Sequence, residues 1–548
     1  MPILKKEYHR LIYLFGLLLF AASLPLSKYF MSVSQMVLIG NWICEADYKN
    51  KLRRFTANKA ALVACLIMVL HLVGLLWTHD FDYAFKDIRI KVPLLIMPFI
   101  VASAEELSIK NIYTILLVHA GAVFAGTLIS VWLLLFTVVN DIRNVSVLIS
   151  HIRFGMNVCF AVFALTWMIS RSAPIKSLVA RIGAGLMVVW FIIYLFITGS
   201  VTGIGIMIVT GLVLVLRFIF TKAQLSVKVL VAGAALAGSL GMYFYISSIV
   251  NEYKNVEPIK LSELEFKTPY GNTYQFNFDN KQIENGHYTW VYICWDELAE
   301  AWNKRSSINF DSNDRKGQPV RYTIVRYITS KGLRKDKDGV NSLSGDDIKA
   351  IEDGVANIRY GENGNFRDRV INLLWEYDNY QLYANPSGQT MMQRVELWKT
   401  SLRIIAAHPW LGVGTGDGKN KFREELEQIN SPLKDLGLRS HNQYLAILIS
   451  FGLIGFIIFL FALLYPAVHQ KRFFTYLYFI FICIMLISMF TEDTLESQPG
   501  VSFFAFWNAV LILGWRKENN EKKQIPNNEK EKTIAGLLFK RRHKKTPS

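Results

Sequence analysis

Long apolar runs dominate the sequence and restrict the folds that are open to it. Examples are LIYLFGLLLFAASLPLS from residue 11, ALVACLIMVLHLVGLLW from residue 61 and LIGFIIFLFALLYPAV from residue 453. Each is about the length that a helix needs to cross the ~30 Å hydrocarbon core of a bilayer. With 52% hydrophobic residues overall, these runs exclude an ordinary soluble protein. They predict an all-α polytopic membrane protein.

The apolar runs predict about 12 transmembrane helices. Their expected starts are near residues 11, 29, 59, 91, 112, 155, 182, 201, 229, 443, 473 and 500. We do not expect the first run to be a removed signal peptide, because it lacks a small-x-small cleavage site and leads directly into a second apolar segment. The eighth span is the weakest, because TGSVTGIGIM is rich in glycine and also fits a re-entrant turn.

The distribution of basic residues orients the predicted spans. If the N-terminus with Lys5, Lys6 and Arg10 is cytoplasmic, the gaps KNKLRR, SRSAPIKSLVAR, RFIFTKAQLSVK and HQKRF also lie inside, as the positive-inside rule requires. The gap at 104–111 is nearly neutral and therefore gives no information on the orientation of the spans. The tail 516–548 also falls inside and carries eleven Lys/Arg against four Glu. We interpret it as a solvated tail near anionic lipid rather than a nucleic-acid-binding segment.

This topology divides the chain into four parts: helices 1–9 over residues 1–249, a hydrophilic loop over 250–440, helices 10–12 over 441–515, and the cytoplasmic tail 516–548. The loop lies outside the cytoplasm, between helices 9 and 10. In its first half, LEFKTPYGNTYQFNFDN alternates apolar and polar residues around a Gly-Asn turn, which predicts strands. The pattern of the next stretch, YTWVYICWDELAEAW, is more typical of a helix. We therefore expect a small α+β domain.

The second half of the loop predicts two helices at the membrane surface. Four apolar residues recur at 3-4-3 spacing before Pro409: Val395, Trp398, Leu402 and Ile405. A second amphipathic stretch carries Phe422, Leu426 and Ile429. Between them, GVGTGDG resembles a phosphate loop in composition only. No strand precedes it and no Gly-Lys-Ser/Thr follows, so we interpret it as a tight turn.

The cysteines and histidines predict neither disulfides nor a metal centre. Four cysteines fall in apolar spans: Cys44, Cys65, Cys159 and Cys483. Only Cys294 lies in the loop, so a disulfide framework cannot form there. No Cys/His pair has the spacing of zinc ligands. We expect no metal and no cofactor.

The stretch RSHNQYLAILISFGLIG, residues 439–455, places an arginine and a histidine at the lip of the tenth span. Anchoring in the headgroup layer is the simplest interpretation. The stretch also resembles the O-antigen ligase and polymerase superfamily, whose pattern H-[NSQ]-x9-G-x-x-[GTY] is matched by His441, Asn442, Gly452 and Gly455. The family's upstream arginine, followed by Leu or Trp four residues on, corresponds to Arg394 and Trp398. The HPWLGVG turn and the position of the large loop are similar too.

The resemblance implies a C-type glycosyltransferase-like fold in the bacterial inner membrane, with the active site facing the periplasm. The implied reaction transfers a glycan from an undecaprenyl-diphosphate carrier to an acceptor such as lipid A–core, and membrane lipids are the other expected partners. The first half of the loop resembles versions found in Bacteroidetes-type bacteria. No nucleic acid partner is expected.

The residue chemistry suits such a transfer. Arginine binds phosphate oxygens bidentately, so Arg394 and Arg439 are the candidate clamp for the departing diphosphate. Histidine titrates near neutrality, so His441 is the candidate base for the acceptor hydroxyl, oriented by Asn442 or a nearby carboxylate. Direct displacement would invert the anomeric centre, and arginines in this role would make a metal unnecessary.

The chain departs from the family at Val201, in TGSVTGIG, where many members have an arginine. Lys91 and Arg153 are candidates to supply that charge, because both are expected on the non-cytoplasmic side of the membrane. Each could instead be a headgroup anchor. Three carboxylates in FTEDTLESQPG could receive the acceptor sugar or pair with the arginines, or form an exposed solvated turn: Glu492, Asp493 and Glu496.

Other functions remain open at this point. A polymerase that joins repeat units on the lipid carrier uses the same donor, and the motifs do not separate it from a ligase. A polysaccharide flippase or another transporter would show paired, broken spans in two halves with charges at mid-membrane. No such pairing is visible here. A structural or sensor protein would leave the arginine and histidine positions unexplained.

Overall fold

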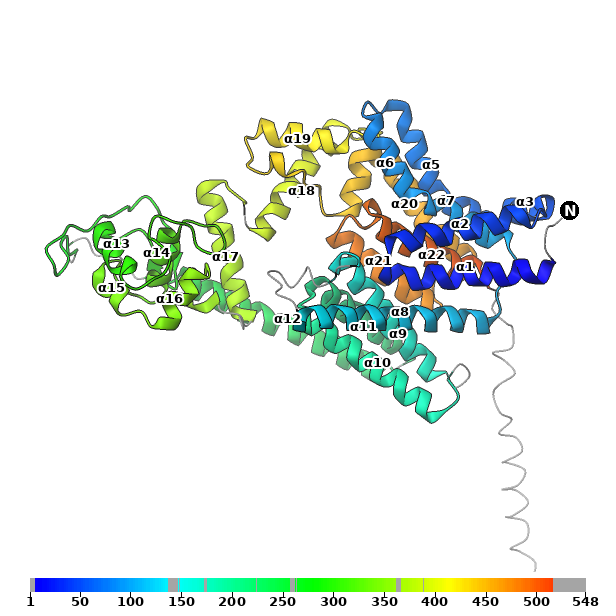
Figure 1. The fold of residues 1–548 in the computed structure, drawn as a ribbon, viewed down its shortest axis with the longest axis horizontal. Coiled ribbons are helices and arrows are strands. Elements are labelled where there is room, and N and C mark those ends of the chain that lie inside the picture. Colours follow the sequence, from blue (N-terminus) through cyan, green and yellow to red (C-terminus); the bar gives the residue numbers. More distant parts are fainter. Residues whose placement is uncertain are drawn as a thin grey trace, which may run out of the picture. The chain divides into compact units, whose positions relative to one another are not determined.

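The computed structural model describes residues 5–515, except residues 137–145, 147, 172–174, 223, 257–261, 263, 361–365 and 388. The chain divides into two compact units, each described here by itself (Figure 1). The first contains Met1–Leu212, His408–Gly418 and His441–Ser548, and the second contains Val213–Ala407 and Lys419–Ser440. The predicted cytoplasmic tail 516–548 lies outside the described residues.

The first unit is a bundle of helices. Its N-terminal part contains α1 (Lys6–Leu26), α2 (Lys28–Cys44), α3 (Tyr48–Ala57), α4 (Lys59–Ala64), α5 (Leu66–Val73), η1 (Gly74–Trp77), α6 (Phe81–Lys91), α7 (Pro93–Ser103), α8 (Ile109–Phe136), α9 (His151–Ser170) and α10 (Leu178–Ile197). Its C-terminal part contains α20 (Gln443–His469), α21 (Tyr476–Thr491), η6 (Thr494–Glu496) and α22 (Gln498–Leu513). The helix α11 (Val201–Lys222) begins in this unit.

The core of the bundle surrounds α22. Every residue from Pro499 to Ile512 is buried, and the helix contacts α1, α7 and α21. A helix that is apolar on all faces is stable only where neighbours cover it. The 492–497 turn enters α22 directly, so the most enclosed helix of the unit begins beside the acidic residues that the sequence singled out.

Eight helices in the described part of the chain are long and apolar enough to cross a membrane: Lys6–Leu26, Lys59–Trp77, Ile109–Phe136, His151–Ser170, Leu178–Ile197, Val201–Thr221, Leu225–Lys254 and Gln443–His469. The Gly-rich eighth span is therefore a continuous helix. Two further predicted spans are the shorter apolar helices α21 and α22. The last two fall on α2 and α7, with 17 and 11 residues. The multi-pass helical architecture is confirmed, whereas twelve crossings stay a prediction.

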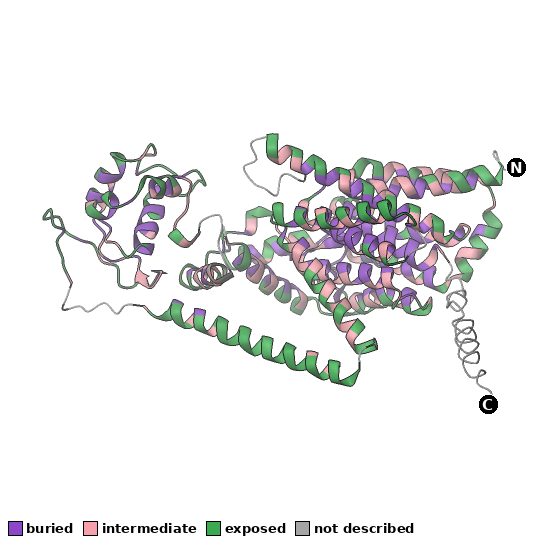
Figure 2. Ribbon diagram, turned by 90° about the horizontal axis from the view of Figure 1, so that it is seen from below, coloured by how far each residue is buried: buried purple, intermediate pink, exposed green. Residues whose placement is uncertain are grey.

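The second unit contains the end of α11, the long helix α12 (Leu225–Lys254) and most of the hydrophilic loop. In Figure 2 almost the whole length of α12 is exposed, as an apolar helix facing lipid would be. The elements of the loop are β1 (Ile283–Glu284), β2 (His287–Tyr288), α13 (Trp295–Asn303), α14 (Val320–Ser330), α15 (Lys337–Asn341), α16 (Gly345–Glu352), η4 (Ile358–Tyr360), α17 (Phe366–Tyr383), α18 (Thr390–Ala407), α19 (Gly418–Gln428) and η5 (Lys434–Leu436).

The loop domain is more helical than the sequence predicts. Its core packs α13, α14 and α16 around Trp302, Ile324 and Ile351. Among the described residues the strands are only two residues each, with Ile283 opposite Tyr288 and Glu284 opposite His287. The predicted hairpin around Gly271 is reduced to one bridge, Lys267 to Thr273. An isolated hairpin is marginal without a third strand or a covering helix, which explains why the alternating pattern formed no longer strands.

The predicted helix before Pro409 is present as α18. Its protein-facing row includes Leu397 and Ile404, both buried, whereas Leu402 of the predicted apolar stripe is 59% exposed. The other three residues of the predicted stripe, Val395, Trp398 and Ile405, are partly buried. A position of this helix at the membrane surface stays a prediction.

Candidate active site

The start of α20 is built around Asn442. Its Oδ1 accepts hydrogen bonds from the backbone amides of Tyr444 and Leu445, at 3.0 and 3.2 Å, which caps the helix. Its Nδ2 donates to the carbonyl of Phe490 at 3.1 Å, which ties the start of α20 to the end of α21. The asparagine therefore positions the residue before it. Direct contact with substrate stays a prediction.

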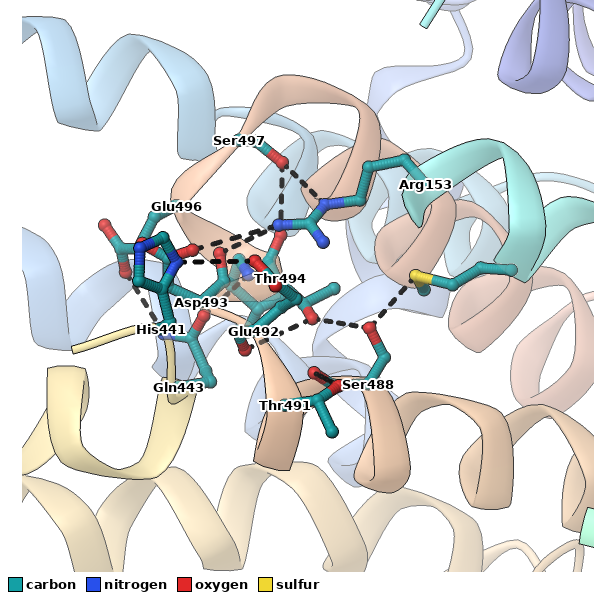
Figure 3. A network of polar contacts seen from close by, with 12 residues as sticks. Arg153, His441, Gln443, Ser488, Thr491, Glu492, Asp493, Thr494, Glu496 and Ser497 are labelled. Carbon is teal, nitrogen blue, oxygen red and sulfur yellow. Dashed lines mark hydrogen bonds and ion pairs between the residues drawn. The ribbon is translucent and has the colours of Figure 1, made fainter. Parts of the chain in front are cut away.

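His441 lies immediately before this cap, in a conformation that side chains rarely adopt. Its φ is +47°, in the left-handed region. The imidazole Nδ1 lies 3.6 Å from Oε2 of Glu492 (Figure 3). The Glu492 side chain is only 9% exposed, whereas that of His441 is 34% exposed. A buried carboxylate thus faces one nitrogen of a histidine that remains accessible to a ligand, and left-handed backbone at a non-glycine residue is typical of functional sites.

The glycines of the motif allow close packing of backbone against backbone. Gly452 interrupts α20 with φ +60° and ψ −164°, and a Cβ there would lie 2.3 Å from the carbonyl carbon of Trp410. The freed amide of Leu453 donates to the carbonyl of Pro409 at 2.8 Å. Residues 408–414 therefore fill the break in α20. The interpretation of the glycine-rich stretch as a tight turn is confirmed, since Gly412 also has a positive φ, +68°.

The 492–497 turn is held in place rather than solvated. Gln443 accepts a hydrogen bond from the Leu495 amide at 2.6 Å and donates to Glu496 at 3.1 Å. The side chains of Asp493 and Glu496 are mostly buried. The interpretation of this segment as an exposed turn is wrong, because interactions with Gln443, Arg153 and Lys91 draw its polar groups inward.

Arg153, near the start of α9, reaches this turn. Its Nε donates to the hydroxyl of Ser497 at 3.1 Å, and its Nη2 donates to the carbonyl of Asp493 at 3.3 Å (Figure 3). The residue is buried, and within the described part of the chain its Nη1 has no hydrogen-bond partner. Arg153 is therefore not a headgroup anchor. Its guanidinium is held at the site by the 492–497 turn, with Nη1 enclosed by protein.

The surroundings of Arg153 also bear on the missing family arginine. A Cβ at Gly155, two residues along α9, would lie 3.2 Å from the hydroxyl of Ser200. Ser200 directly precedes Val201, so the start of α9 packs against the start of α11. Residues two apart lie on nearly opposite sides of a helix, so this contact does not bring Arg153 next to Val201, and its supply of the missing charge stays a prediction.

Lys91 occupies the other side of the turn. Its ammonium group contacts Asp87 and lies 2.9 Å from Oε2 of Glu496, in a fully buried position. Burial raises the pKa of the Asp87 carboxyl, and the Lys91 charge opposes that rise. Lys91 is therefore enclosed by protein and is not an exposed headgroup anchor. It holds Glu496 in place, and contact with the lipid carrier stays a prediction.

The two clamp arginines belong to the second unit. Within it, the indole nitrogen of Trp398 donates to the carbonyl of Ser440 at 2.9 Å, so α18 contacts the segment that contains Arg439. Arg394 lies one turn before Trp398 on the same helix. This bond accounts for the position of Trp398, whereas the role of Arg394 stays a prediction. A meeting of these arginines with His441, which belongs to the first unit, stays a prediction.

One group of described residues could hold a metal ion. His441, Glu492 and Asp493 each offer a ligand atom, and these atoms lie within 4.8 Å of one another. Oxygen-rich sites of this kind suit Mg²⁺ or Ca²⁺. The guanidinium of Arg153 lies 3.9 Å from Asp493, however, and already supplies a positive charge there. The residues therefore fit an arginine-neutralised acidic site better than a cation site.

Transfer is expected to be metal-independent. Purified protein with a carrier-linked donor should keep its activity in excess EDTA, because arginines can stabilise the departing diphosphate without a metal. Glycan transfer would be measured after EDTA treatment and again after Mg²⁺ or Ca²⁺ is returned. Activity that disappears with EDTA and returns with either ion would contradict this prediction and assign a cation to His441, Glu492 and Asp493.

Two polar residues of the site were not recognised in the sequence. Asp87 lies four residues before Lys91. Oppositely charged residues at this spacing are neighbours on a helix, so the pair could have been predicted from the sequence. Gln443 follows the His-Asn pair directly, but nothing in its neighbourhood indicated that it holds the 492–497 turn 50 residues later.

The fold and the site define a multi-pass helical membrane protein with a histidine–carboxylate pair and buried cations at one end of its helical bundle. Residues 353–460 match the family model described as O-antigen ligase. The resemblance to the O-antigen ligase-like superfamily is thereby confirmed, and the match supports a membrane enzyme of the ligase/polymerase family that acts on lipid-linked glycans. A comparison with curated proteins found no match. The matched segment contains Arg394, Arg439 and His441, but neither Arg153 nor the 492–497 turn.

Proposed function

We propose that this protein is an O-antigen ligase of the bacterial inner membrane. It moves a glycan from an undecaprenyl-diphosphate carrier to an acceptor sugar, such as that of lipid A–core, at the periplasmic face. The observation that carries the proposal is the pairing of accessible His441, which lies within the matched O-antigen ligase segment, with buried Glu492 outside it.

The pair suits general base catalysis. A carboxylate facing Nδ1 favours the tautomer with the proton on that nitrogen, which leaves Nε2 to accept a proton. The acceptor hydroxyl loses its proton to Nε2 while its oxygen forms a bond to the anomeric carbon. The bond between that carbon and the phosphate oxygen breaks, and the electron pair leaves with the diphosphate. Glu492 stabilises the imidazolium that results, and attack opposite the leaving group inverts the anomeric centre.

The cations assist the leaving group. Charge that develops on the departing diphosphate is stabilised by donors that are already in position. Arg394 and Arg439 supply bidentate donors, as their family pattern implies. Arg153 adds a buried positive charge beside the 492–497 turn. Because a polyprenyl carrier holds its diphosphate at headgroup depth, catalytic groups at the lip of a membrane helix are where this chemistry requires them.

A deletion strain tests the proposed function directly. Loss of a ligase should leave polymerised glycan attached to undecaprenyl diphosphate and a lipid A–core that carries no polymer. The surface glycan and the carrier-linked pool would be separated and compared with those of the parent strain. A core capped by a single repeat unit would instead identify a polymerase that joins repeat units on the carrier.

The topology is expected to place residues 250–440 in the periplasm. Ser342→Cys introduces a thiol at an exposed position of the loop domain, in a background with Cys294→Ser and Cys44→Ser. A membrane-impermeant thiol reagent should label it in intact spheroplasts, because the basic gaps place the loop on the opposite side from the N-terminus. Labelling only after lysis would contradict the topology and would mean that His441 lies on the cytoplasmic side.

A further inference from the structure

Gln443 is a fully buried polar residue to which the proposed reaction assigns no role. It begins α20, two positions after His441. Its amide bonds two neighbouring residues of the 492–497 turn: Oε1 accepts from the Leu495 amide at 2.6 Å, and Nε2 donates to Oε1 of Glu496 at 3.1 Å (Figure 3). The residue therefore joins the segment that carries His441 to the opposite side of the site.

The orientation of the Gln443 amide is set by its partners. A backbone amide can only donate, so the contact with Leu495 requires the side-chain oxygen. Glu496 offers Oε1 as an acceptor, because its other oxygen, Oε2, lies 2.9 Å from the ammonium group of fully buried Lys91. The Glu496 contact therefore requires the side-chain nitrogen. Lys91, Glu496 and Gln443 thus form a chain of bonds with one arrangement of donors and acceptors.

The 492–497 turn is attached on another side as well. The hydroxyl groups of Ser488 and Thr494 lie 2.8 Å apart, which ties the turn to α21. Gln443 adds an attachment from the start of α20, directly after the His-Asn pair. The turn carries Glu492, so its position relative to α20 determines how that carboxylate faces His441.

We propose that Gln443 is a positioning residue for glycan transfer. It holds the carboxylate of Glu492 at the imidazole of His441, 3.6 Å away, and it acts through Glu492 rather than on the donor or the acceptor. A misplacement of about 1 Å at a reacting centre can cost on the order of 100-fold in rate. The inference rests on the proposed function, in which His441 is the base.

The first test compares kcat and KM of the full-length protein in detergent. Gln443→Met removes both amide groups at similar volume and should lower kcat at least about tenfold, with KM for the donor changed less than about twofold. In protein that carries Glu492→Gln, the same change should have no further effect, because Gln443 acts through Glu492. Gln35→Met is the matched control: Gln35 is buried too, but its Nε2 bonds the carbonyl of Met31 in its own helix, so transfer should be normal.

An exchange of the two side chains keeps the proposal testable if Gln443→Met does not fold. Gln443→Glu alone places two carboxylates against each other and should lower kcat at least as much as Gln443→Met. With Glu496→Gln added, the amide at position 496 can donate to the carboxylate at 443 and accept from Lys91, while that carboxylate still accepts from Leu495. The double variant should therefore recover most of the lost kcat.

Three results would overturn the proposal. Normal kcat in Gln443→Met would show that the two bonds do not matter for transfer. An equal loss with and without Glu492→Gln would show that Gln443 acts independently of that carboxylate. A folded double variant with no more transfer than Gln443→Glu would contradict the assigned donors and acceptors.

Failure of the proposed function is a separate result. Unaltered protein that extends carrier-linked glycan, but does not transfer it to lipid A–core, would be a polymerase. The same variants measured on extension would then decide the role of Gln443, because both reactions move a glycan from the carrier to a hydroxyl group.

Discussion

Replacement of His441 by alanine is expected to lower glycan transfer by at least about 100-fold while the protein remains folded and inserted. The expectation follows from the geometry: His441 is the accessible member of a pair whose other member, Glu492, is buried 3.6 Å away. Without the imidazole, the acceptor hydroxyl has no positioned group to take its proton. Transfer would be measured with purified protein, a carrier-linked donor and an excess of acceptor.

Two further variants make this result interpretable. Asparagine tolerates the left-handed backbone that His441 adopts, so His441→Asn keeps the local conformation and should be as inactive as the alanine variant. His469→Ala removes a histidine from the far end of the same helix and should transfer glycan normally. Near-normal transfer by both His441 variants would remove this residue from the mechanism.

Arg394→Lys is expected to reduce transfer at least about tenfold, although it preserves the charge. An ammonium group cannot bind two phosphate oxygens in the fixed geometry of a guanidinium, so the developing charge on the leaving diphosphate would be less well stabilised. The measurement is kcat with saturating donor, because the interaction should strengthen as the diphosphate departs.

Arg403→Lys is the matched control for the arginine. It lies on the same helix, α18, and is exposed, so the same substitution there should leave transfer unchanged. If Arg394→Lys and Arg394→Ala both retained the activity of the unaltered protein, the assignment of Arg394 to the diphosphate clamp would be wrong.

The sequence shows the spacing of the residues in the glycine motif, but it does not predict how they pack. The pattern of His441, Asn442, Gly452 and Gly455 carries the family resemblance, but it does not say why each residue type is needed. In the structure Asn442 caps α20, and Gly452 admits the backbone of Trp410 into a break in that helix. The partner segment lies about 40 residues earlier in the chain, so no local propensity of α20 could predict the contact.

The sequence by itself determined the class of protein and the family resemblance. Apolar runs of bilayer length, the distribution of basic gaps and the motif spacing are properties of contiguous residues, and the physics of crossing a bilayer acts on them one segment at a time. The same local character explains why α18 was predicted from its apolar spacing.

Only the tertiary structure decided which charged residues meet. Arg153, Lys91 and the 492–497 turn are separated by as many as several hundred positions, and a sequence cannot distinguish a headgroup anchor from a buried ion pair until the partners are known. The difference is physical. A buried cation is stable only where carboxylates or hydrogen bonds from other elements compensate its loss of water, and those elements come together only through packing around α22.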